Sequence, residues 1–223
     1  MYIHREGRKL SLGLLLVTLA IWAAFLLFAK PFNFFHGVFI FILLVLWVLV
    51  TLFFRIPRRV FTEDSQRLIS PADGVVVTIE ETMEKEYIHE ECRQISIFMN
   101  GNDVHVNRYP IDGTVEYVKF HRGNYFVASY PKSSILNERS SIGMRLADGQ
   151  KILIRQVAGT MARRIVCYAR EGESVKQNQE MGFIKFGSRI DIFVPLSFQV
   201  DVDIQDRVKN AISPICTVMP SAS

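Results

Sequence analysis

Charged residues are missing from two long stretches near the start of this 223-residue sequence. Residues 10–29 and 34–54 contain no Asp, Glu, Lys or Arg. At about 1.5 Å per residue, each makes a helix roughly 30 Å long, which is the thickness of a bilayer core. A signal peptide is the alternative for the first stretch, but its apolar region would be about 7–15 residues long, and here a second span follows. The two stretches predict a transmembrane helical hairpin.

Cysteine is also scarce. The three cysteines, Cys92, Cys167 and Cys216, are odd in number and far apart, and they form no CxxC or Cys/His spacing. A disulfide framework is therefore not indicated, and neither is a metal site. This usage fits a reducing cytosol.

The cations that flank the apolar stretches predict their orientation. Residues 4–9 are rich in cations, Arg55, Arg58 and Arg59 follow the second stretch, and the connecting loop contains only Lys30. The cytoplasmic side of a membrane protein is enriched in Lys and Arg, so both ends are expected on the cytoplasmic face of the inner membrane, with the three arginines beside anionic headgroups. Anchoring accounts for part of the net charge of +4, so no nucleic-acid partner is needed.

The sequence after residue 55 has little helical periodicity. Apolar residues alternate in short runs broken by Gly, Asp and Pro, a pattern typical of strands. Clear examples are residues 74–79, 94–99 and 151–157, whereas short helical turns are expected only near 61–68 and 131–137. The sequence therefore predicts two parts, a membrane anchor in residues 1–55 and a mainly β domain in residues 56–223.

A Gly-Ser pair lies between two alternating apolar runs in residues 182–195. By itself, Gly187-Ser188 is typical of a tight turn between two strands. The pair also allows the chain to cleave itself. The Gly187 carbonyl has no flanking side chain to block attack, and the Ser188 hydroxyl can attack it if the backbone is bent and a base accepts the proton.

Three further motifs accompany this pair, at residues 70–74 (SPADG), 103–110 (DVHVNRYP) and 137–140 (NERS). Together they resemble the short form of the phosphatidylserine decarboxylase family, from about residue 56 to 218. The resemblance implies a carboxy-lyase of phospholipid biosynthesis that converts phosphatidylserine to phosphatidylethanolamine and CO2. Its partner is then a membrane phospholipid, whether diacyl or ether-linked.

The same resemblance implies a pyruvoyl cofactor made from Ser188. Attack on Gly187 would cleave the precursor into residues 1–187 (β chain) and 188–223 (α chain), which stay together as a heterodimer. The substrate amine would form a Schiff base with the pyruvoyl group, which accepts the electrons left by decarboxylation. Higher homo-oligomers remain open.

The resemblance points to Asp73 and His105 as the residues that act with Ser188 in cleavage. Longer members of the family carry a second histidine where this sequence has Arg108, and arginine cannot act as a base in proteins. Two alternatives stay open: His105 serves both cleavage and the later proton transfer, or Asp73 acts more directly. Arg108 suits the phosphate or carboxylate of the substrate.

The NER motif supplies the other substrate-binding residues that the resemblance implies, Asn137, Glu138 and Arg139. By themselves these residues are typical of a loop with a salt bridge.

The stretch EGESVKQNQ at residues 171–179, with Gly182 after it, also resembles the biotinyl/lipoyl type of module. It predicts a barrel-sandwich-like β fold. It also raises an alternative function, a membrane-anchored adaptor without catalytic activity. A carrier of that type needs an exposed lysine at a hairpin tip, and the nearest candidates, Lys176 and Lys185, are more typical of solvated strand or loop residues.

Overall fold

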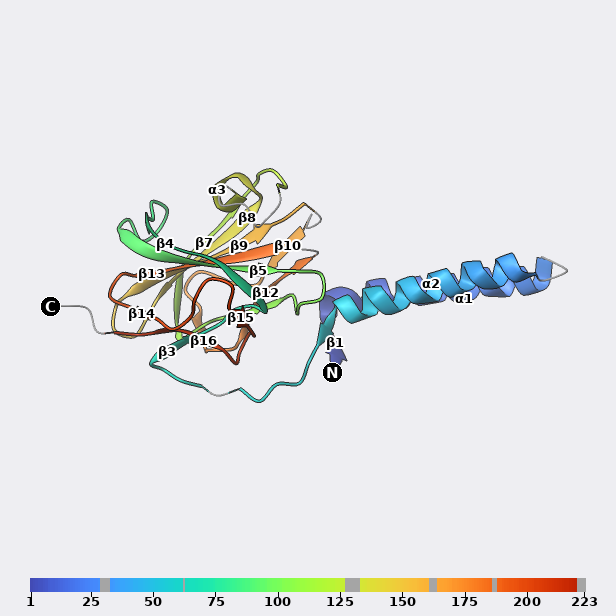
Figure 1. Ribbon diagram of the computed structural model, residues 1–223, viewed down its shortest axis with the longest axis horizontal. Coiled ribbons are helices and arrows are strands. Elements are labelled where there is room, and N and C mark those ends of the chain that lie inside the picture. Colours follow the sequence, from blue (N-terminus) through green and yellow to red (C-terminus); the bar gives the residue numbers. More distant parts are fainter. Residues whose placement is uncertain (29–32, 62, 127–132, 161–163, 186–187, 220–223) are drawn as a thin grey trace. The chain divides into compact units, whose positions relative to one another are not determined.

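A computed structural model describes residues 1–28, 33–61, 63–126, 133–160, 164–185 and 188–219. The chain divides into two compact units, residues 1–58 and 59–223. Both units are drawn in Figure 1.

The first unit is a pair of helices, α1 (Arg5–Phe28) and α2 (Phe34–Phe53), and both predicted helices are confirmed. They are long and apolar enough to cross a membrane. The Asn33 side chain caps α2 by accepting a hydrogen bond from the His36 amide at 3.3 Å. Ser11 of α1 contacts Thr51 of α2 through their hydroxyl groups at 2.7 Å. Two short strands, β1 (Tyr2–Ile3) and β2 (Arg55–Ile56), pair at the base of the hairpin.

The second unit consists of fourteen strands and one short helix in the part of the chain that the structure describes. These elements are β3 (Arg67–Ile69), β4 (Gly74–Met83), β5 (Glu91–Met99), β6 (Val106–Arg108), β7 (Gly113–His121), α3 (Ser133–Leu136), β8 (Arg139–Arg145), β9 (Lys151–Ala158), β10 (Arg164–Cys167), β11 (Ser174–Val175), β12 (Glu180–Lys185), β13 (Ser188–Pro195), β14 (Gln199–Val200), β15 (Arg207–Val208) and β16 (Pro214–Thr217).

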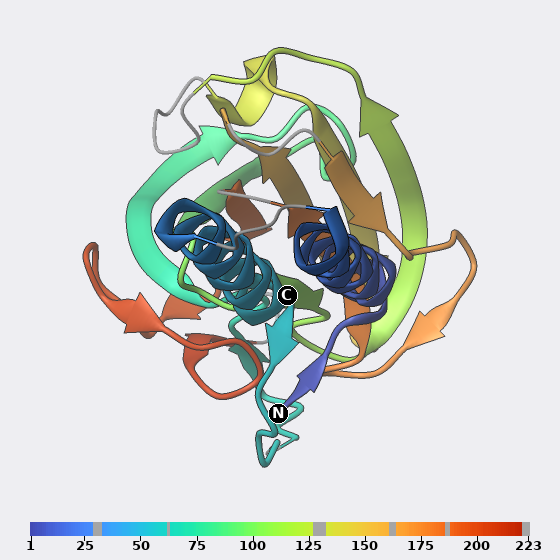
Figure 2. The ribbon, with the colours of Figure 1, turned by 90° about the vertical axis from the view of Figure 1, so that its right-hand side faces the viewer.

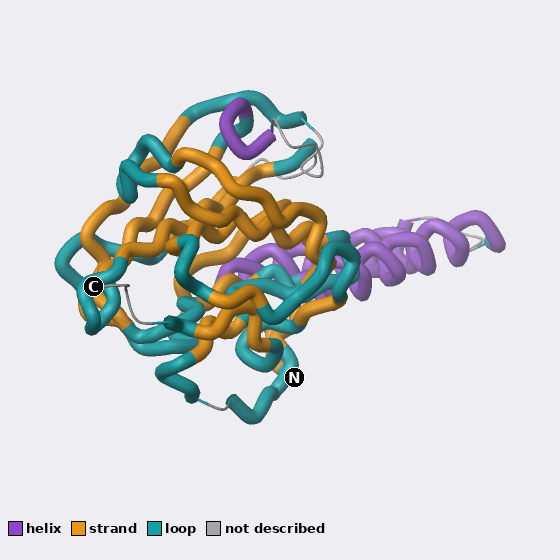
Figure 3. The backbone as a smooth tube through the Cα atoms, turned by 60° about the vertical axis from the view of Figure 1, so that its left-hand side comes forward, coloured by secondary structure: helices purple, strands orange, loops and turns teal. Residues whose placement is uncertain are grey.

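An eight-stranded antiparallel sheet dominates this unit, in the order β11-β7-β8-β9-β13-β5-β4-β15. Figures 2 and 3 show the sheet curled into an open half-barrel. Two three-stranded sheets, β10-β12-β6 and β14-β16-β3, complete the unit. The prediction of a mainly β, barrel-like domain preceded by a helical hairpin is confirmed.

The large sheet has a core on each face because strand residues alternate between faces. Along β13, Ile190, Ile192 and Val194 lie in the main core, which we call the inner face. Phe193 lies on the outer face with a smaller cluster that includes Leu153. All members of both clusters come from residues 68–216.

The chain changes sheets just before Ser188. Strand β12 pairs with β10 and β6, whereas β13 pairs with β5 and β9. The two apolar runs around the Gly-Ser pair therefore do not form a hairpin with each other. Residues 186–187, including Gly187, lie outside the described residues.

The two expected helical turns differ in outcome. The turn near 131–137 is confirmed in its described part as α3. Within 61–68 the described residues contain one turn, closed by a hydrogen bond from the Arg67 amide to the Asp64 oxygen at 3.3 Å, and it is followed directly by β3, which begins at Arg67 and pairs with β16.

Removal of residues 1–54 should leave a domain that folds cooperatively, because its core is built without them. Thermal unfolding of the truncated protein, followed by circular dichroism, should show a single transition and a β-rich spectrum. A truncated chain that is aggregated or lacks a transition would show that the helices are required for folding.

Candidate active site

Ser188 opens β13 and is completely buried. It is paired on one side with Met99 of β5 and on the other with Ala158 of β9. Among the described residues, its Oγ donates a hydrogen bond only to the Met99 sulfur, at 3.9 Å. Thioether sulfur is a weak acceptor, so the described surroundings leave the hydroxyl available for chemistry.

The Met99 sulfur also joins Ser188 to the DVHVNRYP motif. Asn107 donates its Nδ2 to this sulfur at 3.8 Å and accepts Gln156 Nε2 on its Oδ1 at 2.8 Å. Asn107 and Gln156 are both fully buried. The sequence prediction missed both. A signal was present for Gln156, a polar residue in an apolar strand, and for Asn107, which lies inside a quoted motif.

His105 lies two residues before Asn107 and is also fully buried. Its Nδ1 is 2.8 Å from the backbone oxygen of Asp103. A carbonyl oxygen can only accept, so Nδ1 carries the proton, and in the neutral ring Nε2 carries the lone pair. This arrangement equips His105 to accept a proton at Nε2.

Asp73 is held by Arg59 through two charge-assisted hydrogen bonds. Arg59 Nη1 lies 2.6 Å from Asp73 Oδ1 and Nη2 lies 2.7 Å from Oδ2. The Asn210 amide donates to Oδ1 at 2.8 Å, and Asn210 Nδ2 donates to the Val106 oxygen at 2.8 Å. Asp73 is thus linked to the backbone beside His105 through Asn210, and both its oxygens are occupied.

This pairing corrects the expected location of Arg59. The sequence prediction placed its guanidinium beside anionic headgroups, but the side chain is only 11% exposed and is bonded to Asp73. The reason is that Asp73, fourteen residues further along the chain, pairs with Arg59. The number of cations near the membrane spans does not reveal this partner.

Arg108 lies at a partly exposed edge of the site. Its Nη1 donates to the Asn178 oxygen at 2.6 Å, and its guanidinium lies 5.0 Å from the centre of the Phe61 ring. These contacts fix the orientation of the arginine side chain.

Asn137 and Glu138 hold the strand end next to Ser188. Asn137 Nδ2 donates to the Ala158 oxygen at 2.7 Å, and the Glu138 backbone oxygen accepts the Ala158 amide at 2.9 Å. The Glu138 carboxylate accepts the Tyr125 hydroxyl at 2.8 Å. The structure therefore places both residues in contact with Ala158, the strand partner of Ser188.

Arg139 lies on the other face of the sheet. It pairs with Val157, one position before Ala158, and successive strand residues point to opposite faces. Its guanidinium lines a cavity of about 740 Å³ on the outer face. The other lining residues are Glu80, Thr82, Met83, Glu84, Lys85, Glu86, Gln94, Tyr117, Lys119, His121, Ser134, Ile135, Arg155 and Phe193. The structure does not bring Arg139 to the face that Ser188 occupies.

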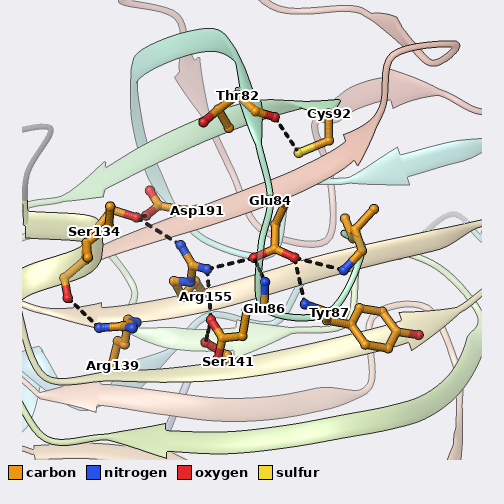
Figure 4. Close-up of polar contacts among 12 residues, drawn as sticks. Thr82, Glu84, Glu86, Tyr87, Cys92, Ser134, Arg139, Ser141, Arg155 and Asp191 are labelled. Carbon is orange, nitrogen blue, oxygen red and sulfur yellow. Dashed lines mark hydrogen bonds and ion pairs between the residues drawn. The ribbon is translucent and has the colours of Figure 1, made fainter. Parts of the chain in front are cut away.

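Glu86 is the centre of a polar network in this cavity (Figure 4). Its carboxylate accepts hydrogen bonds from His121 at 2.5 Å, Arg155 at 2.9 Å and Ser141 at 3.1 Å. Burial raises the pKa of Glu86, but the hydrogen bond from His121 and the charge of Arg155 outweigh burial, so the pKa lies below its usual value.

The network extends to the residue after Ser188. Arg155 Nη1 is 3.4 Å from Ser134 Oγ, which donates to Asp191 Oδ2 at 2.6 Å. Asp191 Oδ1 accepts Arg189 Nε at 2.5 Å, and both of these side chains are fully buried. The start of β13 is thus fixed by a buried ion pair on one face while Ser188 faces the other.

No cluster of three or more His, Cys, Asp or Glu side chains that could hold a metal ion occurs among the described residues. The polar groups linked to Ser188 through the Met99 sulfur are the carboxamides of Asn107 and Gln156, and the imidazole of His105 belongs to the residue two positions before Asn107. These groups can transfer protons and donate hydrogen bonds to a reacting carbonyl group.

The sequence matches the phosphatidylserine decarboxylase family over residues 46–213. Several curated relatives carry the name phosphatidylserine decarboxylase proenzyme. The protein from Parabacteroides distasonis is 43% identical over 216 residues, which cover 96% of this chain and 98% of the relative. The protein from Amoebophilus asiaticus is 48% identical over 79% of this chain and 77% of the relative. The protein from Cytophaga hutchinsonii is 42% identical over 92% of this chain and 93% of the relative.

These matches, together with the buried serine at a sheet crossing, define the protein as a lyase that is made as a proenzyme. The chain belongs to the phosphatidylserine decarboxylase family. The alternative of an adaptor without catalytic activity is not supported.

Replacement of Arg59 tests the buried pair with Asp73. Arg59→Met leaves a carboxylate without its main partner and should lower the free energy of unfolding by about 3 kcal/mol. The matched control is Arg58→Met, because Arg58 is adjacent but exposed. Equal thermal midpoints for the two variants would contradict the structural role of Arg59.

The lowered pKa of Glu86 predicts a specific dependence of stability on pH. The ionised form is favoured in the folded state, so its contribution is complete above the ordinary value of 4.5 and is lost as the pH falls through the lower folded pKa. Glu86→Gln should therefore reduce stability at pH 7 and flatten the loss of stability in acid. The control is the exposed Glu80→Gln, which should leave the profile of thermal midpoint against pH unchanged.

Proposed function

We propose that this enzyme decarboxylates phosphatidylserine to phosphatidylethanolamine and CO2, and that it does so with a pyruvoyl group made by cleavage between Gly187 and Ser188. The observation that carries the proposal is the position of Ser188. It is buried, it stands where the chain changes sheets, and its described surroundings give its hydroxyl only a weak acceptor. The names of the relatives support the substrate and the need for processing.

The cleavage begins with attack of Ser188 Oγ on the carbonyl carbon of Gly187, while His105 Nε2 accepts the hydroxyl proton. The amide becomes an ester. Loss of the α-proton and expulsion of the ester carboxylate then separate residues 1–187 from residues 188–223. Water finally displaces ammonia from the new end, which leaves a ketone. Catalysis by a positioned base contributes about 10²–10⁴-fold to such steps.

The residues around Ser188 fit the small, uncharged product of this reaction. Met99 and Ala158 flank it, and they hold the same backbone atoms before and after cleavage through strand pairing. When present, the pyruvoyl group supplies an electron sink that side chains lack. A dry environment limits hydration of such a ketone and strengthens hydrogen bonds to it.

The other site residues have proposed roles that follow from their contacts. His105 accepts the hydroxyl proton of Ser188 during cleavage. In the later reaction it donates a proton to the substrate carbon that has lost CO2. Asp73, occupied by Arg59 and Asn210, positions the His105 segment. Arg108 contacts the phosphate or carboxylate of the substrate at the partly exposed edge.

Asn137 and Glu138 support this site by holding Ala158, the strand neighbour of Ser188. They contact the substrate only at the partly exposed edge where Arg108 lies. Arg139 acts from the outer face, where it contributes to the cavity. We also propose that the domain faces the cytoplasm, and that the two cleavage products remain as a heterodimer.

Replacement of the nucleophile tests the proposal. Ser188→Ala removes the hydroxyl but fits the same space, so the chain should remain whole and produce no phosphatidylethanolamine. Ser188→Cys retains a nucleophile and should give partial cleavage with little or no decarboxylase activity. Gel migration and lipid analysis measure the two effects. Full decarboxylation by Ser188→Ala would exclude the pyruvoyl mechanism.

His105→Ala tests the proposed base. Cleavage should slow by about 10²-fold or more, and any cleaved fraction should have low turnover, because both steps use Nε2. His89→Asn is a suitable control, since His89 is exposed and has a positive φ that Asn tolerates. Normal cleavage and normal turnover by His105→Ala would remove this residue from the site.

A further inference from the structure

Exposed apolar side chains gather in one part of the second unit. In the described part of residues 59–223, twelve large hydrophobic residues are exposed, and five of them lie between residues 120 and 136. The rest are spread over the chain. A local concentration of this kind marks an interaction surface more often than scattered single residues do.

Four of these residues form what we call the rim patch: Tyr125, Phe126, Ile135 and Leu136. Their exposed fractions are 39%, 49%, 68% and 45%. The two halves of the patch are joined by hydrogen bonds. The Leu136 oxygen accepts the Asn124 amide at 2.8 Å, and the Asn137 side chain bonds both the amide and the oxygen of Phe126 at 3.0 and 2.8 Å.

The rim patch adjoins the end of the sheet where Ser188 lies. The same Asn137 side chain that holds Phe126 donates to the Ala158 oxygen, and Ala158 pairs with Ser188. Helix α3, which carries Ile135 and Leu136, marks the patch in Figure 1. A surface that binds the patch is therefore coupled to the position of the candidate active site.

The charge and the chemistry of this segment favour an anionic lipid surface as its partner. Residues 119–139 contain four Lys or Arg and a single acidic residue, Glu138; Lys119 and Arg139 line the outer-face cavity, and Arg122 is an exposed cation three residues before Tyr125. The Glu138 carboxylate accepts the Tyr125 hydroxyl. Exposed aromatic rings flanked by cations are typical of segments that lie in a membrane interface. The first unit has two helices that can cross a membrane, so the second unit is tethered to a bilayer by its own chain.

We propose that the rim patch inserts shallowly into the headgroup region of an anionic bilayer and so presents the Ser188 end of the sheet to lipid headgroups. A lipid substrate would then reach the site without leaving the bilayer completely. The choice of substrate rests on the proposed function, whereas the insertion itself does not.

Fluorescence of a single introduced tryptophan tests insertion in the full-length protein. The sequence contains two tryptophans, Trp22 and Trp47, both in the helical hairpin, so Trp22→Phe and Trp47→Phe give a silent background. In this background, Phe126→Trp places an indole in the rim patch. The control is Ile204→Trp, at a site that is 53% exposed and distant in sequence.

The proteins are reconstituted in vesicles of phosphatidylcholine and phosphatidylserine that contain brominated phosphatidylcholine. We expect a blue-shifted emission and strong quenching by bromine for Phe126→Trp and neither for Ile204→Trp. Absence of bromine quenching for Phe126→Trp would overturn the proposal. An indole shielded from acrylamide but not quenched by bromine would also overturn it, because a protein surface would then cover the patch.

Activity provides a second measurement. The double variant Phe126→Ser/Leu136→Ser should lose about tenfold or more of its turnover on vesicles but keep its turnover on a short-chain, water-soluble phosphatidylserine. The matched control is Ile204→Ser/Ile212→Ser, which removes two apolar side chains of similar exposure elsewhere. Equal losses on both substrates, or in both double variants, would contradict the proposal. If the protein shows no decarboxylase activity, the proposed function fails while the fluorescence still decides insertion.

Discussion

Strand pairing on both sides of Ser188 is the constraint on which the proposed chemistry depends. Strand β13 pairs with β5 along its whole length and with β9 from Ser188 to Phe193. A break in the chain just before Ser188 would leave these ladders intact, so the new chain end would keep its position. The enzyme can therefore lose a peptide bond at its centre without losing the geometry of the site, and the two products have a reason to remain together.

The outer face of the sheet adds a second restraint through buried charges. Arg189 and Asp191 are completely buried, and Ser134 links them to Arg155 and thus to Glu86. A buried ion pair is weak evidence for net stability, but loss of one partner costs several kcal/mol. The arrangement therefore fixes the start of β13 strongly in one position. The buried charges that position the strand therefore lie on one face of the sheet, and the Ser188 hydroxyl lies on the other.

Local patterns in the sequence predicted the features that depend on local chemistry. Runs without charge predicted α1 and α2, alternation predicted the long strands, and motif resemblance singled out Ser188 and His105. The missed features join residues far apart in the chain. Arg59 finds Asp73, and Gln156 bonds Asn107 across 49 positions. No periodicity encodes such partners, and the sheet crossing before Ser188 was likewise hidden, since two neighbouring strands usually suggest a hairpin.

The intact mass of the purified wild-type protein tests the central claim most directly. We expect two polypeptides, residues 1–187 and residues 188–223. The smaller one should be lighter by one ammonia than the peptide that begins with serine, because its end is a ketone. A single polypeptide with the full mass in an active preparation would contradict the account, and so would a smaller chain with a free serine amine.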